Sequence, residues 1–146
     1  MFVLKHYDEL SKAELYNLLR LRAEVFVVEQ KCAFNDLDNI DQVSFHLMDI
    51  EPDGKMVGIC RIIPPQKLYT ECSIGRVAVD ITNRQTGLGK KLMQKAVDIC
   101  TEKYDGPIKI MAQLYLEKFY TGFGFVTNSE PFLEDDILHI YMVKGN

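Results

Sequence analysis

The chain has 146 residues, the length of one ordinary domain, of which 47% are hydrophobic and 26% are charged. This composition is typical of a globular protein and excludes a fibrous or disordered chain. The formal net charge of -4 and the pI of about 5.4 disfavour nucleic-acid binding, which calls for a basic surface. A chain of this size buries enough surface to fold without disulfides or a structural metal.

Neither a membrane segment nor a targeting segment is predicted. No apolar run reaches the roughly 18 residues that cross a bilayer, and the N-terminus lacks the parts of a signal peptide. The four cysteines are widely spaced and form no CxxC pair: Cys32, Cys60, Cys72 and Cys100. We therefore expect reduced, mostly buried thiols and no bound metal in a cytoplasmic protein. The sequence leaves open whether the protein is a monomer or a homodimer.

The first third of the chain predicts a strand, a helix and a loop. Residues 2–7 are expected to form the strand. Ser11 and Glu14 have capping-box spacing, and apolar residues then recur at helical intervals, which predicts a helix from about residue 12 to the 25–27 region. Arg22 falls on the apolar face of this helix and is therefore expected to have a carboxylate or carbonyl partner. The polar segment 31–42 is interpreted as an ordered loop.

The remainder alternates between strand and helix patterns. A hairpin is predicted from two strands, 43–51 and 56–63, around the turn sequence Pro-Asp-Gly-Lys. The later expected elements are a strand at 71–80, a helix at 87–104, a strand at 108–112, a helical stretch near 114–121, and strands at 125–127 and 139–144. This order predicts an α/β, or α+β, domain with a mixed sheet and helices on both faces.

One stretch carries a ligand-binding pattern. A β-rich run ends at Asp80, and a glycine-containing turn leads directly into the helix at 87–104. The start of a helix carries unpaired backbone N–H groups and the positive end of the helix dipole. Because Gly87 and Gly89 have no Cβ, a ligand can approach this backbone closely. The pattern predicts a site for a phosphate or a diphosphate.

Two familiar phosphate motifs do not fit this turn. A P-loop would need glycine at Arg84 and serine or threonine at Lys91, and a dinucleotide fingerprint would need its third glycine at Leu92. The motif that remains, Arg84-x-x-Gly87-x-Gly89, resembles the R/Q-x-x-G-x-G/A signature of the GCN5-related N-acetyltransferases, the GNAT superfamily.

Two more segments resemble the same family, in the same order along essentially the whole chain. The run 119–125, FYTGFGF, is similar to the family's FYxxxGF element. The run 21–30, LRAEVFVVEQ, is similar to a segment of the ElaA-like branch, whose acidic loop is matched by Cys32, Asp36, Asp38 and Asp41. The chain is thus identified as a GNAT member of that branch. The resemblance implies a single domain over 1–146 with a mostly antiparallel central sheet.

The resemblance also implies a reaction and a set of cofactor contacts. Acetyl-CoA would donate an acetyl group directly, in a ternary complex, to a primary amine of a small molecule or peptide. The pantetheine arm and the thioester carbonyl would lie on Val77, Ala78 and Val79. The diphosphate would lie on Arg84, Gln85, Thr86, Gly87, Leu88, Gly89 and Lys90, with further cofactor contacts from Gln113 and Tyr120.

The chain departs from the family pattern at two places. Gln113 stands where many members have an asparagine that contacts the cofactor. The run 136–139, DILH, stands where the branch usually has Gly-Ile-Pro-His. The first departure concerns one cofactor contact, and the second concerns the shape of the acceptor pocket.

Acyl transfer from a thioester needs an oxyanion donor, a base for the amine and an acid for the thiolate. Backbone N–H groups of 77–79 are candidates for the oxyanion site. Tyr120 matches the family's general acid. His139, Glu71 and Glu29 are candidate bases, each with an alternative structural interpretation. The run 134–136, EDD, can attract a cationic amine or simply face solvent.

Two other functions are compatible with these motifs. One is a catalytically silent domain that binds or senses acyl-CoA. The other is a distant relative of the acyl-homoserine-lactone synthases, whose RxxVF motif is matched at 22–26. Retention of Tyr120 favours an enzyme over the silent domain, and the RxxGxG turn disfavours the synthase.

Overall fold

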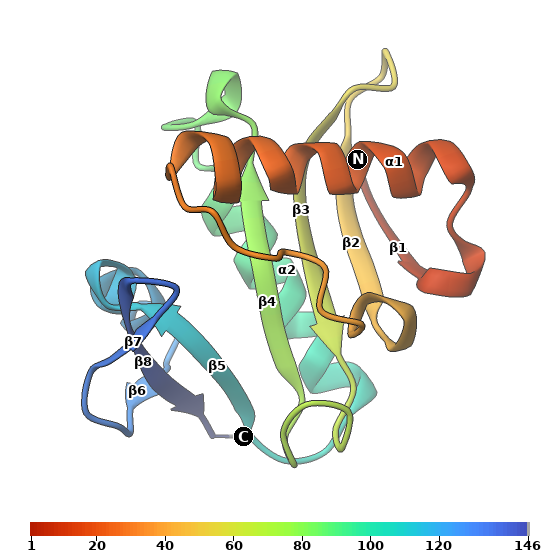
Figure 1. Cartoon of the computed structure of the whole chain (residues 1–146). Coiled ribbons are helices and arrows are strands. Elements are labelled where there is room, and N and C mark those ends of the chain that lie inside the picture. Colours follow the sequence, from red (N-terminus) through yellow and green to blue (C-terminus); the bar gives the residue numbers. More distant parts are fainter. Residues whose placement is uncertain (146) are drawn as a thin grey trace.

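The computed structural model describes residues 1–145, which form two layers of helix around β-sheet (Figure 1). In chain order the elements are β1 (Phe2–His6), η1 (Tyr7–Glu9), α1 (Lys12–Arg22), η2 (Ala23–Glu29), η3 (Asp41–Val43), β2 (Phe45–Ile50), β3 (Met56–Ile63), β4 (Ser73–Val79), η4 (Ile81–Asn83), α2 (Leu88–Lys103), β5 (Ile108–Gln113), η5 (Leu114–Leu116), α3 (Glu117–Thr121), β6 (Val126–Thr127), β7 (Phe132–Glu134) and β8 (Ile137–Lys144).

The strands form two sheets instead of one continuous sheet. The first has the order β1-β2-β3-β4, and the second has the order β5-β8-β6 with β7 also paired to β8; all these pairs are antiparallel. A parallel bridge between Cys72 and Ile108 joins the two sheets. Beyond the bridge β4 and β5 diverge (Figure 1). The predicted α/β class is confirmed. The sequence did not indicate that the two sheets diverge.

The helices cover opposite faces of the first sheet, as predicted. α1 crosses one face and α2 lies behind the other (Figure 1). One buried apolar cluster lies between the sheet and α2, and a second lies between the sheet and α1. The predicted capping box of α1 is present, because Glu14 N–H donates to Ser11 Oγ at 3.0 Å and Ser11 N–H donates to Glu14 Oε1 at 2.8 Å. After Arg22 the helix continues as η2, which has π-helical geometry.

Strand β4 carries a β-bulge in its middle. Arg61 of β3 is the partner of Gly75, whereas Ile59 is the partner of Ala78, so β4 has one residue more than β3 over this interval. Arg76 adopts a left-handed φ of 52° there. A bulge leaves the extra residue outside the ladder and bends the strand. The bulge therefore changes the direction of the second half of β4 relative to β5.

A partly buried group of charged side chains fastens the predicted loop 31–42 to the sheet and to α1. We call it the Arg–Asp cluster, and its members are Arg22, Arg61, Arg76, Asp36, Asp38 and Asp41. Arg22 pairs with Asp36 at 2.8 Å and with Asp41 at 2.7 Å, which confirms the partner predicted for it. Arg61 pairs with Asp38 at 2.6 Å. The loop is thus ordered by ion pairs, not by secondary structure.

The C-terminal region differs from the prediction in one hairpin. β7 was not predicted, and β8 begins at Ile137, two residues before the predicted strand. Asp135 and Asp136 form the tight turn between them with φ of 51° and 62°. Two positive φ values define a type I′ hairpin turn, which usually has Asn-Gly. The sequence did not predict this turn because Asp135 and Asp136 lack the glycine that usually marks it.

The remaining predictions concern thiols, metals and membranes. All four cysteines are free, and Cys60, Cys72 and Cys100 are buried as expected, while Cys32 is half-buried. Cys72 Sγ and Cys100 Sγ are 3.1 Å apart. Within residues 1–145 no cluster of side chains suited to hold a metal ion is found. Over the same residues no helix combines the length and apolar character of a bilayer span.

The Arg–Asp cluster predicts a loss of stability in acid. Burial raises the pKa of Asp38, but hydrogen bonds and the charge of Arg61 outweigh it and lower that pKa to about 2. The unfolded state therefore binds more protons as the pH falls from about 4 to about 2. We expect the free energy of unfolding in urea to fall across this range.

The variant that isolates this effect is Asp38→Asn, with Asp105→Asn at an exposed carboxylate as its matched control. Asp38→Asn should flatten the slope of stability against pH, and Asp105→Asn should keep it. Equal slopes for the two variants would contradict the assignment.

Candidate active site

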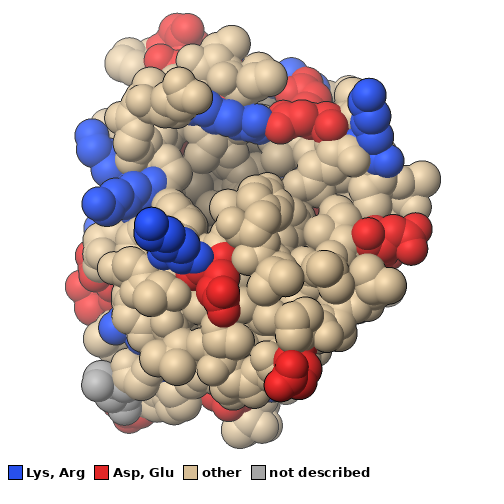
Figure 2. Space-filling model, turned by 90° about the vertical axis from the view of Figure 1, so that its left-hand side faces the viewer, with Lys and Arg blue, Asp and Glu red and all other residues tan. Residues whose placement is uncertain are grey.

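The divergence of the two sheets opens a cavity of about 710 Å³. Figure 2 shows the face of the molecule that is hollowed, with acidic and basic side chains around the opening. Its walls come from η2 and the loop after it, from β3 and β4, and from β5 with the β7–β8 hairpin. A concave hollow of this size is typical of a small-molecule site.

The free edge of β4 forms one wall. β5 leaves β4 after the bridge at Cys72, so the backbone of the following residues has no strand partner on that side. Val77, Ala78 and Val79 all line the cavity. Unpaired strand N–H and C=O groups are strong hydrogen-bonding groups. The wall can therefore bind an extended ligand that carries amides.

The glycine turn lies at the end of this wall. Gly87, with a φ of 84°, is the N-cap of α2, a conformation in which a side chain would be strained. The N–H groups of the first turn of α2 have no partner inside the helix. Arg84 lines the cavity, whereas Gly87 and Lys90 line a separate shallow groove along α2. Four other predicted residues of the turn line neither hollow: Gln85, Thr86, Leu88 and Gly89.

Arg84 connects the two sides of the cavity. Its Nη2 donates to Glu29 Oε1 at 2.7 Å, and its Nη1 donates to the other oxygen of the same carboxylate. The guanidinium also donates to the carbonyl of Val79 at 3.1 and 3.2 Å. The hydrogen bond from Arg84 lowers the pKa of Glu29. Glu29, one of the candidate bases, is therefore a paired carboxylate with reduced basicity.

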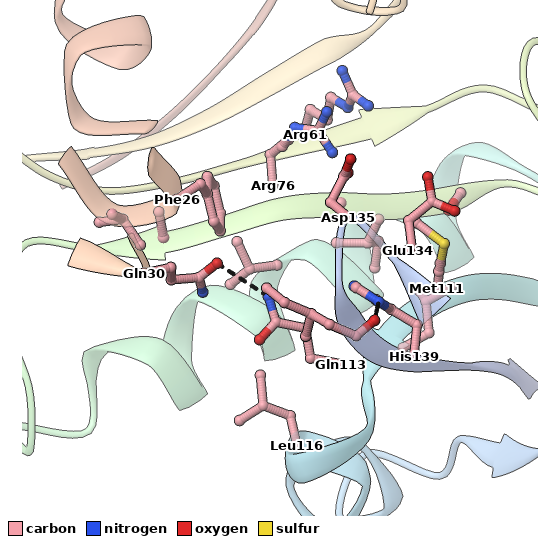
Figure 3. Close-up of a pocket in the computed structure, with 18 of the residues that line it drawn as sticks. Phe26, Gln30, Arg61, Arg76, Met111, Gln113, Leu116, Glu134, Asp135 and His139 are labelled. Carbon is pink, nitrogen blue, oxygen red and sulfur yellow. Dashed lines mark hydrogen bonds between the residues drawn. The ribbon is translucent and has the colours of Figure 1, made fainter. Parts of the chain in front are cut away.

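Gln113 stands at the far side of the cavity. It ends β5, and its Nε2 lies 3.5 Å from Oε1 of Gln30, the residue after η2 (Figure 3). This distance is the limit of a hydrogen bond, so the contact is weak. The amide that replaces the family's asparagine thus points into the cavity beside β4.

Tyr120 lies at the base of the cavity with its ring among aromatic neighbours. Its ring makes edge-to-face contacts with Phe119 and Phe125, and the residue is 9% exposed. Among residues 1–145 its hydroxyl has no hydrogen-bond partner, although Tyr120 lines the cavity. Burial raises the pKa of Tyr120 to about 12. The phenol therefore stays protonated near neutral pH and is available as a donor.

His139 reaches the same cavity from β8. Its Nδ1 is 2.7 Å from the carbonyl oxygen of Ile137 (Figure 3). Because a carbonyl oxygen only accepts, Nδ1 carries the proton and the neutral ring keeps a lone pair on Nε2. The ring stacks on Phe132 at 6.2 Å between centroids, which fixes its plane. His139 thus has the tautomer that a base requires.

The structure brings some predicted groups together and leaves others out. Tyr120 and His139 line the cavity together with the β4 wall, whereas Glu71 does not line it. Glu134 and Asp135 line it too, so two residues of the acidic run face the site. The sequence did not indicate Arg61, Tyr69 or Tyr141, because nothing in a single sequence shows that β3, the loop after it and β8 converge.

The family is established by comparison with known proteins. Residues 10–145 match the model of the acetyltransferase (GNAT) domain, so the chain belongs to the GNAT family of acyltransferases, whose fold binds acyl-CoA. It is similar to ElaA of Escherichia coli, at 38% identity over 142 residues covering 95% of this chain and 92% of ElaA. The crystal structure of that protein gives a TM-score of 0.91 over 99% and 98% of the two chains.

Two further structures set the range of the similarity. An acyl-CoA N-acyltransferase of Pseudomonas aeruginosa is 39% identical, with a TM-score of 0.94 over 99% of this chain and 98% of that one. A CoA-dependent acyl-homoserine lactone synthase, BjaI, has a TM-score of 0.80 at 17% identity over 99% and 82%, which shows a shared fold alone. The chain is a member of the ElaA-like branch.

The Arg84–Glu29 pair predicts a measurable coupling. Both side chains are partly exposed, at 33% and 39%, so solvent screens the interaction. In a double-mutant cycle of Glu29→Ala and Arg84→Ala we expect a coupling energy of about 0.5 kcal/mol in the free energy of unfolding.

The coupling should shrink in 1 M salt, at a Debye length of about 3 Å. A cycle with Tyr16→Ala in place of Glu29→Ala is the control, since Tyr16 is 71% exposed on α1. Additive effects of Glu29→Ala and Arg84→Ala at low salt would contradict the contact.

Proposed function

We propose that this chain is a cytoplasmic, single-domain N-acetyltransferase that transfers an acetyl group from acetyl-CoA to a primary amine of a small molecule or peptide. The supporting observation is the free edge of β4 that runs into the Gly87 turn, beside a cavity lined by Tyr120 and His139. Four free cysteines favour a reducing compartment.

The proposed cofactor site uses backbone groups first. The pantetheine arm lies along Val77–Val79, and backbone N–H groups there stabilise the oxyanion of the thioester carbonyl. The diphosphate lies at the Arg84–Lys90 turn, where α2 begins. Arg84 adds a positive charge that Glu29 holds in place. Gln113 supplies an amide at the far side of the arm.

The proposed reaction is a direct transfer in a ternary complex. The neutral amine attacks the thioester carbonyl, so a C–N bond forms and the C–S bond breaks. The amine proton passes to Nε2 of His139, and the departing thiolate takes a proton from the hydroxyl of Tyr120. Glu71 remains a less favoured base because it does not line the cavity.

A silent acyl-CoA-binding domain and an acyl-homoserine-lactone synthase remain the competing functions. Release of free CoA in the presence of simple amines separates the transferase from the silent domain. Formation of an acyl-homoserine lactone would identify the synthase, whereas use of CoA alone would not, because BjaI is itself a CoA-dependent synthase. The tautomer of His139 and the protonated Tyr120 favour the transferase, since a silent domain needs neither.

Gly89 tests the cofactor site. A Cβ at Gly89 would lie 3.8 Å from Val79 Cγ2, so a leucine side chain would crowd the junction of β4 and α2. We expect Gly89→Leu to raise the Kd for CoA, measured by calorimetry, about tenfold or more. A tenfold change corresponds to the loss of about one hydrogen bond to a charged group. Gly145→Leu, in open space, is the control. Unchanged affinity in Gly89→Leu would argue strongly against the site.

Tyr120 tests the chemistry. We expect Tyr120→Phe to lower kcat about 100-fold, which is the low end of the rate gain from a general acid. The effect is at the low end because a thiolate whose conjugate acid has a pKa of about 8.5 is a good leaving group even without a proton donor. The Kd for CoA should stay the same, because the ring is retained. Tyr16→Phe on α1 is the control. A normal kcat in Tyr120→Phe would remove the residue from this role.

A further inference from the structure

One buried donor in the cavity wall has no partner. Arg61 is 3% exposed and lines the cavity, and its Nε is itself shielded from solvent and lacks a hydrogen bond within residues 1–145. Its other nitrogens are occupied: Nη1 by Asp38 and Asp41, and Nη2 by Asp38. A buried N–H group normally has a partner, so the free Nε–H points to a ligand oxygen.

The space beside this donor is kept open by a glycine. Gly75 is the cross-strand partner of Arg61 and also lines the cavity. A Cβ on Gly75 would lie 3.9 Å from Arg61 Nε. Because Gly75 has no positive φ, its backbone does not itself require glycine. The missing side chain thus leaves room next to the one unused edge of the guanidinium.

The charges around the donor favour a neutral oxygen over a carboxylate. In the Arg–Asp cluster three guanidinium groups face three carboxylates, so the formal charges cancel. Glu134 and Asp135 line the same cavity, and in the described chain neither forms an ion pair (Figure 3). The part of the cavity lined by Arg61, Glu134 and Asp135 is therefore net negative, which repels an anionic ligand and attracts an ammonium group.

From this arrangement we propose that the amine acceptor carries a neutral carbonyl oxygen close to its amino group, and that this oxygen accepts a hydrogen bond from Arg61 Nε–H. The matching substrate class is amino-acid amides and peptide N-termini. Gly75 is then a specificity-determining residue, and Glu134 and Asp135 attract the protonated amine before it loses its proton. The inference rests on the proposed transferase function.

Three acceptors of similar size test the inference: glycinamide, glycine and isobutylamine, which has two methyl groups in place of the amide oxygen and nitrogen. We would measure kcat/KM for each with the wild-type chain and with Gly75→Ala. The basicity of each amine cancels when the preference is compared between the two proteins. Gly145→Ala, a methyl in open space, is the matched control.

The wild type should prefer glycinamide to isobutylamine by about 10-fold or more, the value of a hydrogen bond from a charged donor. Gly75→Ala should lower that preference by a similar factor, and Gly145→Ala should retain it. Thermal unfolding would check that Gly75→Ala is folded, as expected from a contact at ordinary van der Waals distance.

Two results would overturn the inference while leaving the proposed transferase function intact. One is that the wild type and Gly75→Ala show the same preference for glycinamide over isobutylamine. The other is that the wild type prefers glycine to glycinamide. Absence of CoA release with every amine would instead overturn the proposed function, and the inference with it.

Discussion

The second edge of β4 has no strand partner beyond Cys72, and the site depends on that edge. β3 pairs along the whole of β4, but β5 meets it only at the Cys72–Ile108 bridge. Strand groups without a partner must bind water or a ligand. The bulge at Arg76 bends the strand at this point and helps to hold the two sheets apart. The cavity and its wall of unpaired backbone groups both follow from this one edge.

The opposite wall is held by charge instead of by hydrogen-bonded ladders. Loop 31–42 has little regular structure, yet the Arg–Asp cluster ties it to α1, β3 and β4. Buried ion pairs often add little net stability, because desolvation offsets the attraction between the charges. They fix geometry instead, since each guanidinium donates its hydrogen bonds in its own plane. The cluster thus fixes the position of Arg61 in the cavity wall, including its unpaired Nε.

A protonated phenol, Tyr120, and an imidazole with its proton on Nδ1, His139, line the same cavity from separate elements. Burial keeps Tyr120 on α3 protonated, while the carbonyl of Ile137 keeps the proton of His139 on Nδ1. A hydroxyl donor and an imidazole nitrogen with a free lone pair are the two kinds of group that acid–base chemistry uses. The carboxylate of Glu29 is instead paired with Arg84, and that pair links the turn before α2 to η2.

The sequence by itself determined the local features: the capping box at Ser11, the hairpin around 52–55, the amphipathic α2 and the glycine turn that precedes it. These depend on contacts within a few residues, so their patterns are readable along the chain. It also indicated that Arg22 has a carboxylate or carbonyl partner, because an unpaired buried guanidinium is costly. Only the tertiary structure decided where the sheets part, which carboxylates pair, and that Glu71 lies outside the cavity while Arg61 lines it. Those outcomes depend on residues far apart in the chain and on the Cα register of neighbouring strands, which no local pattern specifies.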